Sequence, residues 1–346
     1  MREAFSDIVG NDALRARLLR DISGDRFSHA YVLEGPSGSG KHMLALRIAA
    51  ALSCENRKSE AHPLPCASCP SCRKILSGNS PDVIYIHRGD KATLGVEAIR
   101  AMHGDVYIAP HESEAKVYVI EDAHLLTPQA QNAFLLTLEE PPAYVCFLLL
   151  CQTASSLLET VRSRAPTLRM ELPDRETVKD LLCRTLPEAS LLRRQSVRDL
   201  EELILDADGS IGVAMELVRD GKLRKQVAER RQRALSFVRL CQGRHNSAEA
   251  LQFLQGLGQK RDEVTLDLCR ILLCLRDLLL YKQSEQAPLC FFADCEEAAA
   301  LSYGFSAPEL LRLSDCINTA IERLRMNANV RLTLTGMAVQ AGLLSS

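Results

Sequence analysis

The sequence lacks both a long apolar run and an appreciable excess of charge. Its longest apolar stretch, Val145–Cys151, is far too short to span a bilayer and suits a buried strand. The N-terminal stretch MREAFSDIVG has no apolar core of the signal-peptide kind. We therefore expect a cytoplasmic protein that does not contact membranes. A formal net charge of −2 provides no global basic field, so contacts with DNA would come from a local patch or through partner subunits.

The chain is rich in cysteine, although an odd total of 13 argues against a closed disulfide framework. Nine of the cysteines are scattered through apolar segments. We interpret these nine, Cys269 and Cys274 among them, as small core residues. The other four lie close together in a polar, proline-rich stretch: Cys54, Cys66, Cys69 and Cys72.

The clustered cysteines have the spacing of a closed metal site, C-x11-C-x2-C-x2-C. Four thiolates can surround one Zn²⁺ ion tetrahedrally, which leaves no open position for catalysis. The alternative is that these four thiols are incidental or redox-active. Under that interpretation, core packing does not explain why four cysteines cluster in a polar stretch. His62 lies within the stretch, but four cysteines already complete a zinc shell. The pattern therefore predicts a structural Zn²⁺ ion bound by Cys54, Cys66, Cys69 and Cys72.

A length of 346 residues allows two or three domains, and the pattern changes along the chain. Residues 1–170 alternate short apolar runs with amphipathic stretches, which is typical of a parallel sheet covered by helices. Beyond Pro173 only helical patterns remain, and they become longer after about residue 235. Strands are predicted at 30–35, 82–87, 116–122 and 144–151, and helices at 42–52, at 126–140 and, near the C-terminus, at about 307–325.

The stretch GPSGSGK, residues 35–41, has the pattern of a phosphate-binding loop between a strand and a helix. Its glycines let backbone amides converge on phosphate oxygens, and Lys41 can reach the outer phosphates. His42 follows where the pattern has the Ser or Thr that ligates Mg²⁺, and imidazole is a poor ligand for that cation. We therefore expect neither Mg²⁺ nor appreciable ATP turnover, while binding of ATP or ADP stays open. The candidate nucleotide-binding residues are Gly35, Pro36, Ser37, Gly38, Ser39, Gly40, Lys41 and His42.

An acidic pair, Glu121-Asp122, ends the third predicted strand. ATPases with such loops usually carry Asp before Glu, with the Asp near the metal and the Glu orienting the attacking water. The swapped order moves each carboxylate by about one methylene, and phosphoryl transfer depends on positioning. We interpret the pair as a degenerate catalytic motif; the alternative is two solvated acids at a strand end.

Several segments, taken in order, resemble one protein family. They are FSDIVGN (5–11), HAYVLEGPSGSGK (29–41), the four cysteines, KVYVIEDAHLL (116–126), QNAFLLTLEEPP (131–142) and RSRA (162–165). They resemble the clamp-loader subunits of bacterial DNA polymerase III, AAA+ proteins called delta prime and gamma/tau. The resemblance implies an α/β AAA+ P-loop domain with a parallel sheet and an inserted zinc knuckle (1–170), an α-helical lid (171–235) and an α-helical collar for oligomerisation (236–346).

Departures from the family pattern favour a delta prime-like subunit. Active gamma-type subunits carry a phosphate-sensing arginine after Gly-Ser-x in the lid, whereas Gly212 occupies that position here. The family's trans-acting arginine finger is matched by Arg164, with Ala165 in place of the family's Cys. The resemblance thus implies a stator that hydrolyses little ATP and supplies Arg164 to a neighbour. The alternatives are a working gamma/tau-type ATPase, a different AAA+ machine and, for Arg164, a surface salt bridge.

The resemblance also implies the partners of the chain. These are gamma/tau and delta subunits in a hetero-oligomeric ring, the sliding clamp, and primer-template DNA reached through the complex. A basic run at 218–233 could contact DNA phosphates directly. The alternative is a solvated helix that joins lid and collar. The run contains Arg219, Lys222, Arg224, Lys225, Arg230, Arg231 and Arg233.

Overall fold

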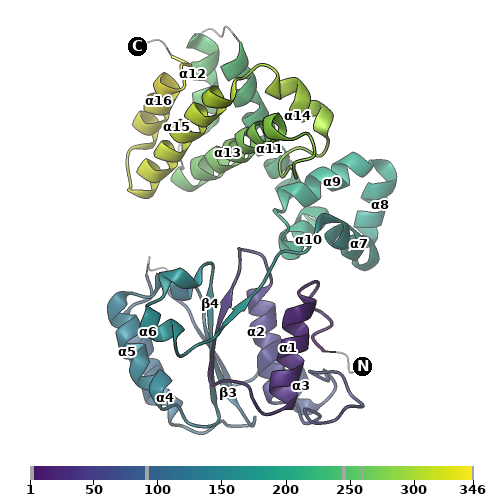
Figure 1. Cartoon of the computed structure of the whole chain (residues 1–346), viewed down its shortest axis with the longest axis vertical. Coiled ribbons are helices and arrows are strands. Elements are labelled where there is room, and N and C mark those ends of the chain that lie inside the picture. The colour runs from purple at the N-terminus through teal and green to yellow at the C-terminus, as the bar shows by residue number, and fades with distance from the viewer. Residues whose placement is uncertain (1–3, 90–92, 244–246, 259, 345–346) are drawn as a thin grey trace. The chain divides into compact units, whose positions relative to one another are not determined.

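The structure of the chain is a computed structural model that describes residues 4–89, 93–243, 247–258 and 260–344 (Figure 1). By its internal contacts the chain divides into two compact units. The first is Met1–Thr177 together with Gly209–Gly212, and the second is Val178–Asp208 together with Val213–Ser346.

The first unit is built on a five-stranded sheet in the order β2-β3-β4-β1-β5, in which every strand pair is parallel. The predicted α/β fold with a parallel sheet is thereby confirmed. β4 lies between β3 and β1, and all its residues are buried, as a two-sided parallel strand requires. Four strands agree with the prediction, and β5 was not predicted. The strands are β1 (Ala30–Glu34), β2 (Val83–Ile86), β3 (Lys116–Ile120), β4 (Val145–Cys151) and β5 (Thr167–Arg169).

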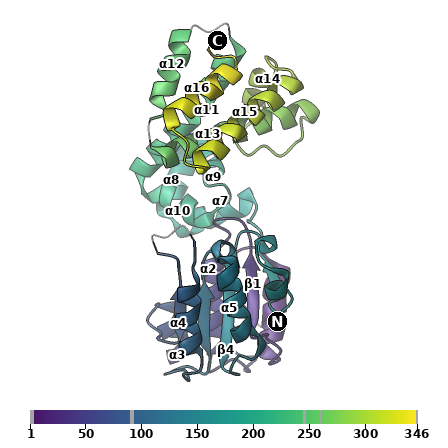
Figure 2. The same cartoon turned by 90° about the vertical axis from the view of Figure 1, so that its left-hand side faces the viewer.

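Helices cover both faces of this sheet (Figures 1 and 2). Alternate residues of β4 point to opposite faces: Leu148 packs in the same apolar cluster as Ile48 of α2, and Phe147 packs with Phe134 of α5. α5 begins at the cap residue Thr127. The helical segments are α1 (Asp12–Ser23), α2 (Lys41–Leu52), α3 (Pro70–Leu76), α4 (Val96–Val106), η1 (Ala123–Leu125), α5 (Pro128–Glu139), η2 (Ala154–Ser156) and α6 (Glu159–Arg162).

The described secondary structure of the second unit is helical, and residues from Ala234 onward pack around one apolar cluster. Residue 235, the predicted boundary between lid and collar, falls inside the continuous helix α11, and the division into three domains stays a prediction. No helix in the described part of the chain is both long and apolar enough to cross a membrane. The helices are α7 (Arg175–Thr185), α8 (Pro187–Gln195), α9 (Val197–Asp206), α10 (Ile211–Arg219), α11 (Gly221–Gln242), α12 (Ser247–Gly256), α13 (Arg261–Gln283), α14 (Cys295–Ser302), α15 (Ala307–Arg325) and α16 (Val330–Gln340).

A cluster of buried charges joins α9, α11 and α13 within the second unit. Asp206 at the end of α9 pairs with Arg270 of α13, and its Oδ1 lies 3.5 Å from Nη1 of Arg231 in α11. The guanidinium of Arg231 also stacks 4.5 Å from the ring centroid of Phe291. Each of the three charged side chains is less than one-tenth exposed. One buried carboxylate is therefore shared by two guanidinium groups. Each of these has one further, more exposed carboxylate nearby: Glu202 lies 3.9 Å from Arg231, and Asp208 lies 3.4 Å from Arg270.

Three cations of the basic run are engaged inside this unit. Arg231 belongs to the buried cluster, and Arg230 and Arg233 both pair with Asp267 of α13, at 3.8 and 2.9 Å. These three side chains are therefore not a freely solvated face. The rest of the run, Arg219, Lys222, Arg224 and Lys225, lies at the surface with only Arg224 half-buried.

The interpretation of the nine scattered cysteines as core residues is wrong for two of them. Cys269 and Cys295 are exposed. Cys269 follows the buried Leu268 on α13, and the buried face of that helix continues at Ile271 and Cys274. The helical period turns the intervening residue outward.

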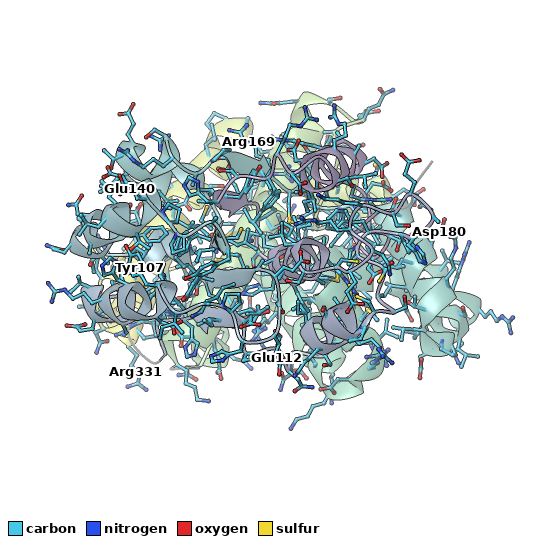
Figure 3. All side chains as sticks on the ribbon, turned by 90° about the horizontal axis from the view of Figure 1, so that it is seen from below. Tyr107, Glu112, Glu140, Arg169, Asp180 and Arg331 are labelled. Carbon is cyan, nitrogen blue, oxygen red and sulfur yellow. The ribbon has the colours of Figure 1, made fainter. Side chains whose placement is uncertain are left out.

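A buried carboxylate anchors the segment between α4 and β3. Asp82, which is fully buried, accepts hydrogen bonds from the backbone N–H groups of His111, Glu112 and Ser113 at 2.6, 2.9 and 2.8 Å. Burial by itself raises the pKa of Asp82, but these three donors outweigh it and the pKa is lowered. The segment that is held lies at the surface, where Tyr107 is 57% exposed (Figure 3).

We predict that Asp82→Asn lowers the free energy of unfolding at neutral pH by about 2 kcal/mol, because a neutral amide is a weaker acceptor for three backbone donors. A lowered pKa means that the stabilisation is complete above the unfolded-state value of about 3.9 and disappears as the pH falls through the folded-state value. Chemical denaturation at pH 7 and in acid measures the difference. Asp12→Asn, a change at a side chain that is 87% exposed, is the control. An equal loss at both pH values would contradict the role of the ionised carboxylate.

Candidate nucleotide and metal sites

The glycine-rich loop follows the carboxyl end of β1 and leads into α2. Gly38 and Gly40 adopt positive φ angles of 77° and 86°, which turn the backbone into the start of the helix. Lys41 donates hydrogen bonds from Nζ to the carbonyl oxygens of Gly35 and Pro36, at 2.7 and 2.8 Å. Burial lowers the pKa of its ammonium group. Lys41 is thus held across the mouth of the loop by the loop's own carbonyl groups.

The two altered positions of the nucleotide motifs meet in space. His42, the second residue of α2, places Nε2 3.2 Å from Oε1 of Glu121 at the end of β3. Asp122 has a φ of 47°, and its Oδ2 lies 3.9 Å from Nε of Arg88. Each residue therefore has a protein partner at the edge where an ATPase would hold its metal.

The Gly209-Ser210 turn packs directly on the loop within the first unit. A Cβ atom added at Gly38 would lie 2.3 Å from Cβ of Ser210, so only glycine fits there. Ser210 is 6% exposed. Gly212, where the resemblance predicts a sensing arginine in active subunits, offers no side chain. The sequence carried no signal for the contact between Ser210 and Gly38, which are far apart along the chain.

Arg164 lies at the other edge of the sheet. It precedes β5, whose Thr167 pairs with Val32 in the middle of β1, whereas the loop follows the end of β1. Its guanidinium donates to Oε1 of Glu139 at 2.8 Å and to the carbonyl oxygen of Thr160 at 3.0 Å. The side chain is 37% exposed, so Arg164 makes a surface salt bridge in the free chain and points away from its own loop. Glu139 was not singled out from the sequence, although it lies in the LEEPP segment.

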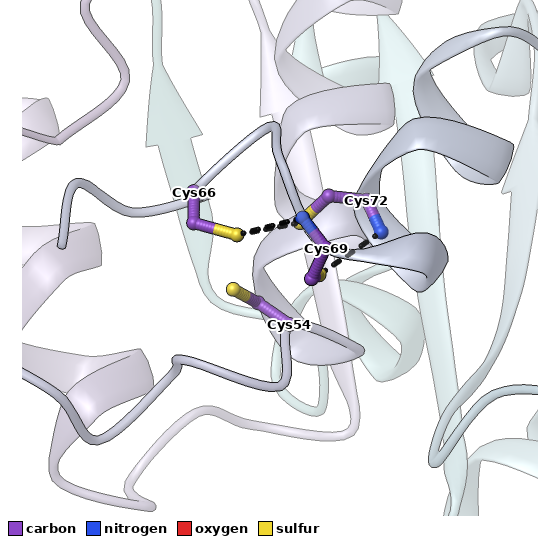
Figure 4. Close-up of side chains that lie close together, drawn as sticks. All are labelled: Cys54, Cys66, Cys69 and Cys72. Carbon is purple, nitrogen blue, oxygen red and sulfur yellow. Dashed lines mark hydrogen bonds between the residues drawn. The ribbon is translucent and has the colours of Figure 1, made fainter.

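The four clustered cysteines converge as their spacing predicts (Figure 4). Their sulfur atoms all lie within 4.8 Å of one another, and Sγ of Cys66 is 3.9 Å from Sγ of Cys72. A tetrahedral zinc ion with Zn–S bonds of about 2.3 Å would require sulfur atoms about 3.8 Å apart. All four residues are buried, in the same apolar cluster as α2. The donor set and its spacing are compatible with a structural Zn²⁺ ion.

Several N–H groups donate hydrogen bonds to sulfur atoms of this cluster. The backbone N–H groups of Cys69 and Cys72 donate to Sγ of Cys66 and Cys69, both at 3.4 Å. Asn56 also donates to Cys66. Burial raises the pKa of the Cys66 thiol, but donors from Asn56, Ser68 and Cys69 overcome this and lower it to about 5. His62 is not part of the cluster and contacts Ser59 instead.

Comparison with known proteins finds similarity to subunits of DNA polymerase III. A family model described as "DNA polymerase III, delta subunit" matches residues 10–174. The tau subunit of DNA polymerase III from Salmonella typhimurium is 34% identical over 62% of this chain, and that from Bacillus subtilis is 27% identical over 95% of it. The chain is related to bacterial clamp-loader subunits. The resemblance predicted from its motifs is thereby confirmed, at the level of the family and not of the individual subunit.

The chain spans only part of these clamp-loader relatives: 32% of the Salmonella protein and 60% of the Bacillus protein. A gamma subunit from Buchnera aphidicola subsp. Acyrthosiphon pisum is 31% identical over 62% of this chain, which spans 57% of that protein. Among solved structures, a gamma subunit-related protein from Thermotoga maritima aligns over 94% of this chain and 98% of its own, with a TM-score of 0.49 and 17% identity.

Proposed function

We propose that this chain is a delta prime-like subunit of a DNA polymerase III clamp loader, which hydrolyses little ATP itself. The observation that supports this most is the contact of His42 with Glu121, 3.2 Å apart at the place of a metal-ligating hydroxyl and carboxylate. A histidine engaged with the motif's carboxylate offers Mg²⁺ neither the hydroxyl nor a free acid. The absence of a side chain at Gly212 removes phosphate sensing as well.

The proposed partners follow from this role. In the cytoplasm the chain would join gamma/tau and delta subunits in a ring that loads the sliding clamp onto primer-template DNA. Its lid and collar would be residues 171–235 and 236–346, with the collar as the oligomerisation domain. Most of the lid and all of the collar fall in the second compact unit, while residues 171–177 and 209–212 belong to the first. DNA would be reached through the complex, because three cations of the basic run already have carboxylate partners.

A gamma/tau-type ATPase is the second candidate. The observation in its favour is the naming of the relatives, since the three compared above are tau or gamma subunits. Under this alternative the loop would bind and hydrolyse ATP despite the substituted positions. Measurement of turnover separates the two candidates.

We predict negligible ATP hydrolysis by the purified chain alone, and no rescue by His42→Thr alone, because the acid pair and the sensor stay altered. The matched comparison restores all positions together: His42→Thr, Glu121→Asp, Asp122→Glu and Gly212→Arg. An added side chain fits at position 212, since a Cβ there meets nothing closer than 4.0 Å. Phosphate release in Mg²⁺ measures turnover. Robust hydrolysis by the contaminant-free wild-type chain would favour the gamma/tau alternative.

Arg164 is proposed to act on the nucleotide of a neighbouring subunit. Its place at the edge of the sheet opposite its own loop prevents action in cis, and its salt bridge with Glu139 is exposed enough to exchange for another anion. A guanidinium can neutralise charge that spreads over the transferred phosphoryl group. Arginine is suited to this because its planar fork makes two parallel hydrogen bonds.

Arg164→Ala should leave assembly intact and reduce the DNA- and clamp-stimulated hydrolysis of the reconstituted complex. A lost finger lowers turnover at its own site by on the order of 10³-fold, so the total falls only partly when other sites continue. Arg164→Lys should rescue poorly, and Arg162→Ala, an exposed arginine on α6, is the control. Wild-type rates of ATP hydrolysis and clamp loading in the Arg164→Ala complex would contradict the trans-acting role and indicate that Arg164 is structural.

The cysteine cluster is proposed to hold one structural Zn²⁺ ion. We predict about one zinc per chain in protein purified without chelators, and loss of the metal with a lower thermal midpoint in Cys69→Ser, since the cluster shares a core with α2. Cys269→Ser, at an exposed cysteine outside the cluster, should keep its zinc. Elemental analysis checks both variants. Metal-free, reduced and fully folded wild-type protein would exclude the zinc site.

A further inference from the structure

The glycine-rich loop keeps its capacity to receive phosphate. The ammonium of Lys41 has three donor hydrogens, and its hydrogen bonds in the described chain, to Gly35 and Pro36, use two of them. The third is left for an anion at the start of α2, where the helix dipole also favours negative charge. The hydroxyl of Ser39, in a residue that is only 8% exposed, has no hydrogen-bond partner in the described part of the chain. The third donor of Lys41 is therefore the group that the loop offers to a phosphate oxygen, while the Ser39 hydroxyl is an unsatisfied polar group buried beside it.

The place of the metal is occupied by protein groups instead. The His42 imidazole lies beside the Glu121 carboxylate, and neither group is deeply buried, with side-chain exposures of 62% and 30%. A magnesium ion would find no hydroxyl ligand at position 42 and would have to compete with the imidazole for Glu121. The donor set thus fits the phosphates of a nucleotide and does not fit the metal that normally accompanies them.

We infer that the loop binds a nucleoside di- or triphosphate without magnesium, with the His42–Glu121 pair standing where the metal would be ligated. The inference deepens the proposed function and rests on it for the class of ligand. Lys41 and the amides at the start of α2 hold the phosphates. Glu121 is engaged by His42 and does not bind a cation. The nucleotide then stays bound without being hydrolysed, because His42 and Glu121 contact each other and do not hold a metal ion.

The test is the binding of ADP, and of ATP in parallel, to the full chain by calorimetry with and without Mg²⁺. Magnesium is removed from the buffer with a cation-exchange resin, because a chelator could also strip the cysteine cluster. The wild-type dissociation constant should agree within about twofold between the two buffers. His42→Thr restores the hydroxyl and frees Glu121, so Mg²⁺ should tighten its binding on the order of tenfold, as a ligand to a charged group can.

Three further variants locate the effect. Lys41→Ala should abolish nucleotide binding in both buffers. That result would identify the glycine-rich loop as the binding site. Glu121→Gln should tighten metal-free binding, because it removes a negative charge near the phosphates. His62→Thr, the same exchange at an exposed histidine beside the cysteine cluster, should behave as wild type. Thermal unfolding and zinc content, measured for each variant, separate a lost ligand contact from a lost fold.

Tighter binding of nucleotide by the wild type in Mg²⁺, by tenfold or more, would overturn the inference, and so would an absence of binding in both buffers. Neither outcome by itself decides the proposed function, which depends on turnover and on Arg164. Conversely, robust hydrolysis by the wild-type chain would contradict the proposed function directly. Binding that is equal in both buffers, together with a magnesium requirement that appears in His42→Thr, would support the inference.

Discussion

The parallel direction of all five strands is the constraint on which the arrangement of the sites depends. In a parallel sheet every carboxyl end lies at one edge, so the loop after β1 and the acids after β3 meet there although they are far apart in sequence. The same polarity sends residues before β5 to the other edge, which is where Arg164 lies. A single sheet thus has the glycine-rich loop at one edge and Arg164 at the other.

In the second unit, which has no sheet among its described residues, buried salt bridges hold several helices together. Asp206 ends α9, and its pairing with Arg231 and Arg270 joins this helix to α11 and α13. Removing that carboxylate would leave each buried guanidinium with one more exposed partner, Glu202 for Arg231 and Asp208 for Arg270, and would therefore be destabilising. The helices predicted as lid and as collar therefore share one network of charges, in agreement with their membership of a single compact unit.

Long apolar segments could be predicted from the sequence, whereas contacts made by single residues could not. β4 was evident because a run such as VCFLLLC has few alternatives to burial on both faces. β5 has only three residues, of which Leu168 alone is buried, and it exists because β1 offers an edge on which to pair. The cysteine cluster was predictable since its spacing is local. The partner of Arg164, by contrast, is Glu139 at the end of α5, and no local sequence pattern indicates that carboxylate.

The glycines of the loop have a reason to be glycine that is independent of any nucleotide. A Cβ at Gly35 would lie 2.7 Å from the carbonyl oxygen of Met170, and one at Gly38 would collide with Ser210. Packing against the segments that lead into the helical unit therefore requires both residues, whether or not phosphate is bound. Position 42 is different, because its side chain is 62% exposed and no packing constraint fixes it. The loop thus departs from the ATPase pattern at position 42, where the usual hydroxyl would serve only chemistry. It has the glycines of that pattern, which the fold requires in any case. A matching glycine pattern is therefore weak evidence for hydrolysis.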